Sequence, residues 1–388
     1  MGVSLVEVAQ QLKDSTKLIQ LVYAFNGTGK TRLCNELKRI VDLDQAKSED
    51  TELDIVDSKF IYYNAYTEDL FIWENNEYVG DDRKSKLGIK PNSFTDWIFR
   101  VQGQDSNISK NFKRYTDSRL TPEINAEFNE ITFSYARGNE ETVKNIKISK
   151  GEESNYIWCV FFAVLQETIS ILEEHDDMQD ETGITTSLKY VFIDDPVTSL
   201  DDNHLIYLAI DLAALVKKSC KLNVKFVITT HNPLFYNVLL SELNNDAKDI
   251  GYFRNKHFCK SRLDKFEDGT FAFIELANDS PFAYHLLLKD EIKSAITSGN
   301  LRKYHYNFLR NMYEKTAIFL GYKSYYDLLP LDSEGKPDPY VNRLININSH
   351  SKHSGEEVDA LSHEEKDEIV RIFNHLIKNH KFFSEVKS

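Results

Sequence analysis

The amino-acid sequence predicts an α/β domain followed by a small all-α domain. A chain of 388 residues with 41% hydrophobic side chains is long enough to bury two separate cores. The apolar runs "LIQLVYAF", "LKYVFIDD" and "VKFVITTH" each lead into polar residues, as buried parallel strands do at the sheet edge where ligands bind. Later apolar residues take helical spacing. We place the boundary in "RLDKFEDGTFAFIELANDSPFAY", with the α/β domain over 1–264 and the all-α domain over 265–388.

The charge and the cysteines exclude several classes of protein. A net charge of −14 argues against a broad basic surface that coats DNA, although local basic patches are compatible with it. No signal peptide opens the chain, and the longest apolar run, "IWCVFFAVL", is far shorter than the ~20 residues of a membrane span. We therefore expect a cytoplasmic protein without membrane contact. The four cysteines lack C-x-x-C spacing, so neither a zinc site nor a disulfide framework is expected.

The segment "LIQLVYAFNGTGKTRL" predicts a phosphate-binding loop between a strand and a helix. Its glycines allow backbone N–H groups to surround phosphate oxygens, Lys30 adds a positive charge near the terminal phosphates, and Thr31 offers a hydroxyl group to Mg²⁺. Ala24 replaces the first glycine of the usual pattern and is small enough to be tolerated. We expect a nucleoside triphosphate, ATP or GTP, and the choice between them stays open because no base-reading element is recognisable. The predicted nucleotide-binding residues are Asn26, Gly27, Thr28, Gly29, Lys30, Thr31 and Arg32.

Two acids and a histidine follow the other apolar runs. Asp194 ends one run, where a phosphate-loop protein holds Mg²⁺, and we expect it to bind the ion with Thr31, directly or through water. Asp195 would orient or deprotonate the attacking water, although many ATPases have the longer Glu there. His231 ends the third run and could contact the γ-phosphate.

Two further short motifs accompany the phosphate loop. "ISKGEE", with Ser149 and Gly151, precedes a long apolar helix, and "SLD" at 199–201 follows the acidic strand. In this order the motifs resemble those of the ABC-type ATPases, in the branch shared with chromosome-maintenance and DNA-repair ATPases. The resemblance implies that Ser149 and Gly151 complete the nucleotide site of a partner, in a head-to-tail homodimer or a higher homo-oligomer. "YYNAYTEDLFIWENN" lies where these ATPases carry a glutamine, and it contains none.

Two alternating runs between the loop and "ISKGEE", "ITFSYAR" and "VKNIKIS", predict a hairpin. No heptads run through this region, so the long coiled-coil arm of the chromosome-maintenance relatives is not expected.

The last third of the chain predicts three helices. "YHLLLKDEIKSAITSG" and "LRKYHYNFLRNMYEKTAIFLGY" each stop at a glycine, and a third helix starts with the capping box Ser362-x-x-Glu365. A polar stretch, "LININSHSKHSGEE", separates the last two. On the second helix Arg310 and Glu314 are four residues apart, a spacing that by itself is most often a surface ion pair.

An ABC-type ATPase followed by this tail is similar to the PrrC-type anticodon nucleases. The resemblance implies that the ribonuclease site consists of Arg310, Glu314 and a histidine, either His350 or His353, with His350 preferred because it directly follows "LININS". The tail also resembles the HEPN ribonucleases, for which Arg343 is a secondary candidate.

These side chains suit RNA cleavage without a metal ion. A base takes the proton of the 2′-hydroxyl group, an acid protonates the leaving 5′-oxygen, and a guanidinium group stabilises the charge on phosphorus. The products would be a 2′,3′-cyclic phosphate and a 5′-hydroxyl. Residues one to two turns earlier either contact RNA bases and backbone or form an ordinary solvated helix surface: Arg302, Lys303, Tyr304, His305 and Tyr306.

The resemblance implies an endoribonuclease that cuts tRNA, with lysine tRNA as the target, in the anticodon stem-loop. It also implies a phage-defence toxin that a type I restriction-modification complex keeps latent. An alternative is a defence ATPase that senses phage products or DNA and signals through its helical tail to a separate effector. A DNA-repair ATPase is a third interpretation, weakened by the absence of a predicted coiled coil.

Overall fold

The computed structural model describes residues 2–43, 59–64, 71–79, 82–90, 93–137, 141–177, 188–196, 202–266, 268–276, 284–349 and 361–382. The chain divides into two compact units, Met1–Pro281 and Phe282–Ser388.

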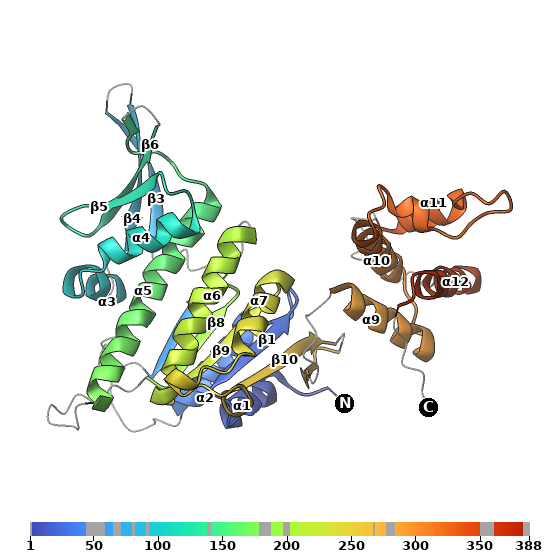
Figure 1. Cartoon of the computed structure of the whole chain (residues 1–388), viewed down its shortest axis with the longest axis horizontal. Coiled ribbons are helices and arrows are strands. Elements are labelled where there is room, and N and C mark those ends of the chain that lie inside the picture. Colours follow the sequence, from blue (N-terminus) through green and yellow to red (C-terminus); the bar gives the residue numbers. More distant parts are fainter. Residues whose placement is uncertain are drawn as a thin grey trace. The chain divides into compact units, whose positions relative to one another are not determined.

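The first unit contains a six-stranded, mostly parallel sheet in the order β11-β10-β1-β9-β8-β2 (Figure 1). All six residues of β1 are buried, because the strand lies inside the sheet and helices cover both of its faces. Only the edge strand β11 runs antiparallel, to β10. The strands are β1 (Ile19–Ala24), β2 (Phe60–Asn64), β8 (Tyr190–Asp194), β9 (Lys225–Thr230), β10 (Phe258–Lys265) and β11 (Phe271–Glu275).

Alternating side chains of the strands bind the helices to the two faces of this sheet. Val22 and Phe192 share one hydrophobic core with α1 and α2, whereas Tyr63 packs against Trp158 of α5 on the other face. Tyr23 packs edge-on against Tyr236 of α7. The helices of this layered arrangement are α1 (Leu5–Asp14), α2 (Lys30–Leu43), α5 (Lys150–Asp177), α6 (Asp202–Lys218), α7 (Pro233–Leu243) and the short α8 (Arg254–His257), with 3₁₀ turns η3 (Ser219–Leu222) and η4 (Lys248–Ile250).

A second sheet, in the order β3-β4-β6-β5, lies between the phosphate loop and α5 in the chain. Phe112 and Phe133 pack against Tyr156, which joins this sheet to α5. The predicted hairpin forms, but its second strand is only β7 (Thr142–Val143). The other elements are β3 (Phe71–Val79), β4 (Asp82–Ile89), α3 (Ser93–Asp96), the π-helical turn η2 (Trp97–Val101), α4 (Asp105–Tyr115), β5 (Leu120–Ile124) and β6 (Glu130–Ala136).

Helix α5 is longer and more apolar than the run "IWCVFFAVL" indicated. Its segment Lys150–Glu174 is, by length and composition, able to cross a membrane, but 78% of its most apolar window is buried inside the structure. This burial is what a core helix between a sheet and other helices requires. Among the described residues, no other helix passes the same test.

The division between the units lies later in the chain than the sequence predicted. The expected boundary between 264 and 265 falls inside β10, whereas the structure divides after Pro281. β11 pairs with β10 along five residues, and Phe271 also pairs with Val3 near the N-terminus. The polar residues between these strands had suggested a linker, but they connect the two strands of a hairpin.

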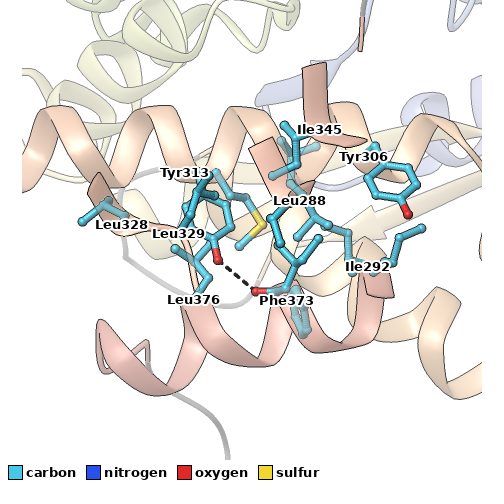
Figure 2. Close-up of a cluster of buried hydrophobic side chains, with 14 of the residues drawn as sticks. Leu288, Ile292, Tyr306, Tyr313, Leu328, Leu329, Ile345, Phe373 and Leu376 are labelled. Carbon is cyan, nitrogen blue, oxygen red and sulfur yellow. Dashed lines mark hydrogen bonds between the residues drawn. The ribbon is translucent and has the colours of Figure 1, made fainter. Parts of the chain in front are cut away.

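The described part of the second unit is helical and has its own core (Figure 2). Leu288, Ile292, Leu309 and Phe373 come together from three helices, and the Tyr313 hydroxyl donates a hydrogen bond to the Ile372 carbonyl at 3.0 Å. The elements are α9 (Tyr284–Ser298), α10 (Tyr304–Leu320), η5 (Tyr325–Leu328), α11 (Pro339–Ser349) and α12 (His363–Asn379).

Helix α11 was not predicted. Pro339 stands at its first position, the Asp338 carboxylate accepts a hydrogen bond from the Tyr340 N–H at 2.9 Å, and Val341 and Ile345 are buried. An acid before a proline, followed by apolar residues four apart, is a signal for the start of a helix. We did not predict this helix because the segment continues into the polar stretch "LININSHSKHSGEE".

Candidate functional site

The phosphate loop joins β1 to α2 in the conformation that phosphate binding needs. Gly27 and Gly29 have φ values of +78° and +106°, a region that residues with a Cβ atom rarely adopt. The Thr28 N–H donates to the Phe25 carbonyl at 3.2 Å and closes the turn. Ala24 is the buried last residue of β1, which explains why a small side chain is accepted there in place of glycine.

Lys30 is folded into this loop with its charge neutralised. Only 8% of its side chain is exposed, and Nζ lies 3.3 Å from Asp195 Oδ2. Nζ also donates to the Ala24 and Phe25 carbonyls at 3.3 and 3.4 Å and to Asn26 Oδ1 at 3.3 Å. A buried ammonium group needs such partners, and this arrangement holds it beside the N–H groups that begin α2.

The two predicted Mg²⁺ ligands meet at the carboxyl edge of the sheet. Thr31 Oγ1 donates to Asp194 Oδ2 at 2.7 Å, and Thr229 Oγ1 donates to Asp194 Oδ1 at 2.7 Å. Burial raises the pKa of Asp194 above its ordinary value, against these hydrogen bonds and the charge of Lys30.

The donor set fits Mg²⁺. Within the described ranges no three His, Cys, Asp or Glu side chains converge on one point, but Mg²⁺ usually takes only one or two carboxylates and completes its shell with phosphate and water. Thr31 and Asp194 supply hard oxygen ligands of that kind beside a phosphate loop.

Asp195 connects Lys30 to His231. Its Oδ1 accepts from Thr230 Oγ1 at 3.1 Å and from the His231 N–H at 3.3 Å, and its Oδ2 contacts His231 Nδ1. Burial alone would raise the pKa of Asp195, but the His231 hydrogen bond and the Lys30 charge outweigh it, so the pKa lies below the ordinary value. Asp195 also has a φ of +53°, a strained conformation of the kind found at functional sites.

Ser149 and Gly151 lie at the start of α5. The Ser149 N–H and Oγ both interact with Glu152 Oε2 at 2.7 Å, and the Glu152 N–H donates to Ser149 Oγ at 3.2 Å, which is a capping box. Ser149 is exposed, so the residue is available to a second molecule. The "SLD" motif at 199–201 lies outside the described residues.

Two residues that the sequence did not single out reach the predicted Mg²⁺ ligands from β2. The register of β2 and β8 pairs Asn64 with Asp194. Asn64 Nδ2 donates to the Tyr62 hydroxyl at 2.9 Å, Tyr62 hydrogen-bonds in turn with Thr31, and its ring packs edge-on against Phe192. Tyr62 and Asn64 could have been identified from the run "KFIYYN", because it is a short apolar strand that ends in an amide side chain.

In the second unit the structure brings Arg310 and Glu314 together. Arg310 Nε lies 2.8 Å from Glu314 Oε1, with 23% and 40% of the side chains exposed. The adjoining side of α10, which carries Leu309 and Tyr313, is buried in the core, so the pair lies at the border between core and solvent. Arg343 is exposed on α11, whose backbone is described as far as Ser349. His350 and His353 lie outside the described residues.

The residues just before this pair do not all face solvent. His305 and Tyr306 are completely buried, so both alternatives, contact with RNA and a solvated helix surface, are wrong for these two residues. The Arg302 N–H donates to His305 Nδ1 at 2.9 Å, and the Tyr306 hydroxyl donates to the Glu365 carbonyl at 3.1 Å. Both side chains hold the start of α10 in place.

No protein-family model matches the chain. The SMC head domain from Thermotoga maritima aligns with 68% of this chain and 92% of its own length, at 14% identity and a TM-score of 0.29. The Smc head domain with an extended coiled coil from Pyrococcus furiosus, bound to the C-terminal domain of ScpA, covers 53% of this chain and 40% of its own, at 13% identity and a TM-score of 0.28.

A curated protein of Escherichia coli is much closer in sequence. It is named anticodon nuclease and is 44% identical over 410 aligned positions, which cover 99% of this chain and 99% of that protein. The match therefore includes the phosphate loop, the acidic strand and the helical tail. The chain belongs to the family of the PrrC-type anticodon nucleases.

Proposed function

We propose that the chain is a nucleotide-regulated endoribonuclease that cuts tRNA in the anticodon loop. The observation that carries this proposal is the 44% identity to an anticodon nuclease over 99% of both chains. The ion pair of Arg310 and Glu314, half-exposed on α10, supports it, because both side chains are present, close together and accessible to a substrate.

The cleavage step follows from the chemistry of these side chains. One of Glu314 and the histidine takes the proton of the 2′-hydroxyl group, and the 2′-oxygen attacks the adjacent phosphorus. The other protonates the 5′-oxygen as its bond to phosphorus breaks, which leaves a 2′,3′-cyclic phosphate and a 5′-hydroxyl. Arg310, always charged, binds the phosphate oxygens through its guanidinium N–H groups. His350 is the preferred histidine and His353 the alternative.

The first unit binds and hydrolyses ATP or GTP. The loop N–H groups and Lys30 hold the phosphates, and Thr31 and Asp194 would hold Mg²⁺, which neutralises phosphate charge when bound. Asp195 accepts a proton from the attacking water, and its contact with His231 Nδ1 directs the other ring nitrogen of His231 toward the terminal phosphate. Arg32, exposed on the first turn of α2, adds positive charge at the rim of the site.

The biological setting is also a proposal. Ser149 and Gly151 of one copy complete the nucleotide site of another, in a head-to-tail homodimer or a higher homo-oligomer. Lysine tRNA is the substrate, and a type I restriction-modification complex in the cytoplasm keeps the toxin latent until phage infection. Closure of the nucleotide-bound dimer is the step that controls the nuclease.

Incubation of purified protein with total tRNA, nucleotide and Mg²⁺, followed by mapping of the RNA ends, tests this function. We expect cuts in one anticodon loop with cyclic phosphate ends, and their loss in Arg310→Ala, Glu314→Gln and one of His350→Ala or His353→Ala. A helical ion pair at the border of the core contributes on the order of 0.5 kcal/mol to stability, so these variants should stay folded. Arg39→Ala is the matched control, since Arg39 forms a 3.0 Å ion pair with Glu36 within α2.

Intact tRNA under every nucleotide condition, or equal cutting by Arg310→Ala, would overturn the nuclease proposal. Phage protection that is lost in Lys30→Ala but kept in Glu314→Gln would favour the alternative, a defence ATPase that signals to a separate effector.

A further inference from the structure

Tyr115, the last residue of α4, joins three helices of the first unit. Its hydroxyl group donates a hydrogen bond to Asp211 Oδ2 on α6 at 2.5 Å, and its carbonyl accepts one from Asn155 Nδ2 on α5 at 2.9 Å. Tyr115 is completely buried, and Asn155 is 4% exposed. A buried polar group that loses its partner costs the free energy of its desolvation, so these bonds resist any shift of α5 or α6 against α4.

Arg114, the residue before Tyr115, binds the same side of α6. Its guanidinium group forms a 2.8 Å ion pair with Asp211 and lies 5.4 Å from the centroid of the Tyr207 ring, one turn earlier on α6. Burial and the neighbouring carboxylate raise the pKa of Tyr115, so its hydroxyl group keeps the proton that it donates. We call these five residues the Tyr115 junction: Arg114, Tyr115, Asn155, Tyr207 and Asp211.

The Tyr115 junction lies close to the start of α5. Asn155 is less than two helical turns beyond Ser149, whose side chain caps this helix. The next residue, Tyr156, packs edge-on against Phe112 of α4. Because a hydrogen-bonded helix is stiff over so short a distance, the places of Asn155 and Tyr156 determine where Ser149 and Gly151 lie.

We propose that Tyr115 is a positioning residue for the nucleotide site that two chains share. Through its bonds to Asn155 and Asp211, it holds the start of α5 in place. Ser149 and Gly151 are thereby placed to reach the nucleotide that a partner chain binds. This inference rests on the homodimer of the proposed function.

The phosphate-binding residues of the same chain have partners of their own. Lys30 pairs with Asp195 at 3.3 Å, and Thr31 donates to Asp194 at 2.7 Å. Loss of the Tyr115 hydroxyl group should therefore leave the binding of nucleotide to a single chain unchanged. It should slow hydrolysis, which needs the start of α5 from the partner.

The test is hydrolysis of ATP and GTP by the full-length Tyr115→Phe variant, which keeps the buried ring and removes only the hydroxyl group. We expect kcat to fall about 10- to 100-fold, since a misplacement of about 1 Å costs on the order of 100-fold, while the Kd of a fluorescent nucleotide stays the same. Asp211→Leu, which removes the same hydrogen bond from the other side, should behave alike. Asp211→Asn, which keeps an oxygen to accept the bond, should retain most of the activity.

Tyr135 provides a matched control. Its hydroxyl group donates to Asp117 at 3.4 Å, and Arg119 pairs with Asp117 at 2.6 Å and lies 4.9 Å from the centroid of the Tyr135 ring. These are the same three residue types, but they join neighbouring segments of the second sheet and not three helices. Tyr135→Phe should leave kcat unchanged, and an equal fall of kcat in both variants would overturn the positioning role.

Mixed dimers show which chain supplies the damaged part of the site. Tyr115→Phe mixed with Lys30→Ala should recover about a quarter of wild-type activity, because about half of the dimers are mixed and one of their two sites is intact. That site combines Lys30 of the first variant with the start of α5 of the second. Tyr115→Phe mixed with Ser149→Arg should stay at the residual activity of Tyr115→Phe, because neither chain supplies a correctly placed Ser149.

The outcomes separate this inference from the proposed function. Recovery with Ser149→Arg and not with Lys30→Ala would overturn the inference, because it would assign Tyr115 to the nucleotide site of its own chain. Lys30→Ala mixed with Ser149→Arg tests the shared site itself. If that mixture recovers activity but the Tyr115→Phe mixtures do not follow the expected pattern, only the role of Tyr115 is wrong. If that mixture recovers none, the shared site is wrong as well.

Discussion

Single side chains at the proposed nucleotide site are held by partners from three strands. Lys30 and Asp195 neutralise each other inside the first unit, and Thr31 and Asp194 share a hydrogen bond. Tyr62 and Asn64 extend this chain of hydrogen bonds by two further groups. Such outer partners orient the groups that bind a metal ion and tune their affinity.

Tyr62→Phe should weaken Mg²⁺-dependent nucleotide binding about 10-fold, at the lower end of the usual effect of outer partners. The variant keeps the ring against Phe192 and removes only the hydroxyl that contacts Asn64 and Thr31. Titration of a fluorescent nucleotide with Mg²⁺ and with a chelator measures the difference. Tyr190→Phe is the control, because Tyr190 begins β8 and Asp194 ends it. An equal loss of binding in both variants would contradict a role specific to Tyr62.

His305 should make the second unit sensitive to acid. Burial lowers the pKa of His305, and protonation of Nδ1 would break its hydrogen bond from Arg302. The unfolded chain then takes up a proton near pH 6.5 while the folded chain does not. The free energy of unfolding should fall as the pH drops below about 6.5, by at most about 1.4 kcal/mol per pH unit.

Urea unfolding at several pH values checks this. His305→Gln should flatten the dependence on pH, whereas a change at the exposed His363 should not. Parallel pH curves for wild type and His305→Gln would show that His305 is not responsible.

At the scale of elements, α10 carries two features at once. One side packs on the core, and Arg310 and Glu314 lie at the edge of that side. The end of the helix is fixed by Gly321, where the Tyr322 N–H donates to the Ala317 carbonyl at 2.9 Å.

Gly321→Ala should lower the free energy of unfolding by about 1 kcal/mol, the cost of a left-handed conformation for a residue with a Cβ atom. No atom lies within 4 Å of the added Cβ, so the cost is conformational and not steric. Gly321→Asn should cost less, because asparagine tolerates this conformation better. Chemical denaturation of the three proteins gives the comparison, and a larger loss for Asn than for Ala would contradict the explanation.

The β10–β11 hairpin determines where the first unit can be cut. A fragment 1–281 should be soluble and bind nucleotide, whereas a fragment 1–264 should aggregate, because it lacks Phe271 and leaves the edge of β10 unpaired. Size-exclusion chromatography and thermal unfolding compare them. Equal behaviour of the two fragments would show that β11 is dispensable for the sheet.

At the scale of the whole molecule, each nucleotide site in the proposed dimer takes residues from two chains. Lys30→Ala should abolish hydrolysis because it removes the ammonium group that holds the phosphates. Ser149→Arg should abolish it because it disrupts the contact with the nucleotide bound by the partner chain. In a dimer of one Lys30→Ala chain and one Ser149→Arg chain, one of the two sites combines the intact Lys30 of one chain with the intact Ser149 of the other. Since about half of randomly formed dimers are mixed in this way, a mixture of the two variants should recover about a quarter of wild-type activity. Two affinity tags measure the fraction of mixed dimers, and mixed dimers without activity would contradict a shared site.

Much of the local structure was predictable because its signals are short in sequence. The strand, loop and helix around "NGTGKT" and the glycine stops at Gly299 and Gly321 depend on neighbours a few residues away. The pairing of Arg310 with Glu314 was predictable too, since residues four apart share a helix face. Their role in catalysis stays a prediction.

The sequence by itself therefore determined the phosphate loop, most helices and the order of the two units, because backbone conformation and helical spacing are local properties. Only the tertiary structure decided that Asn64 lies beside Asp194, that β11 belongs to the first unit and that His305 is buried. Each of these depends on which distant segments pair or pack together, and that choice is made by the total apolar area buried and the hydrogen bonds satisfied across the whole unit.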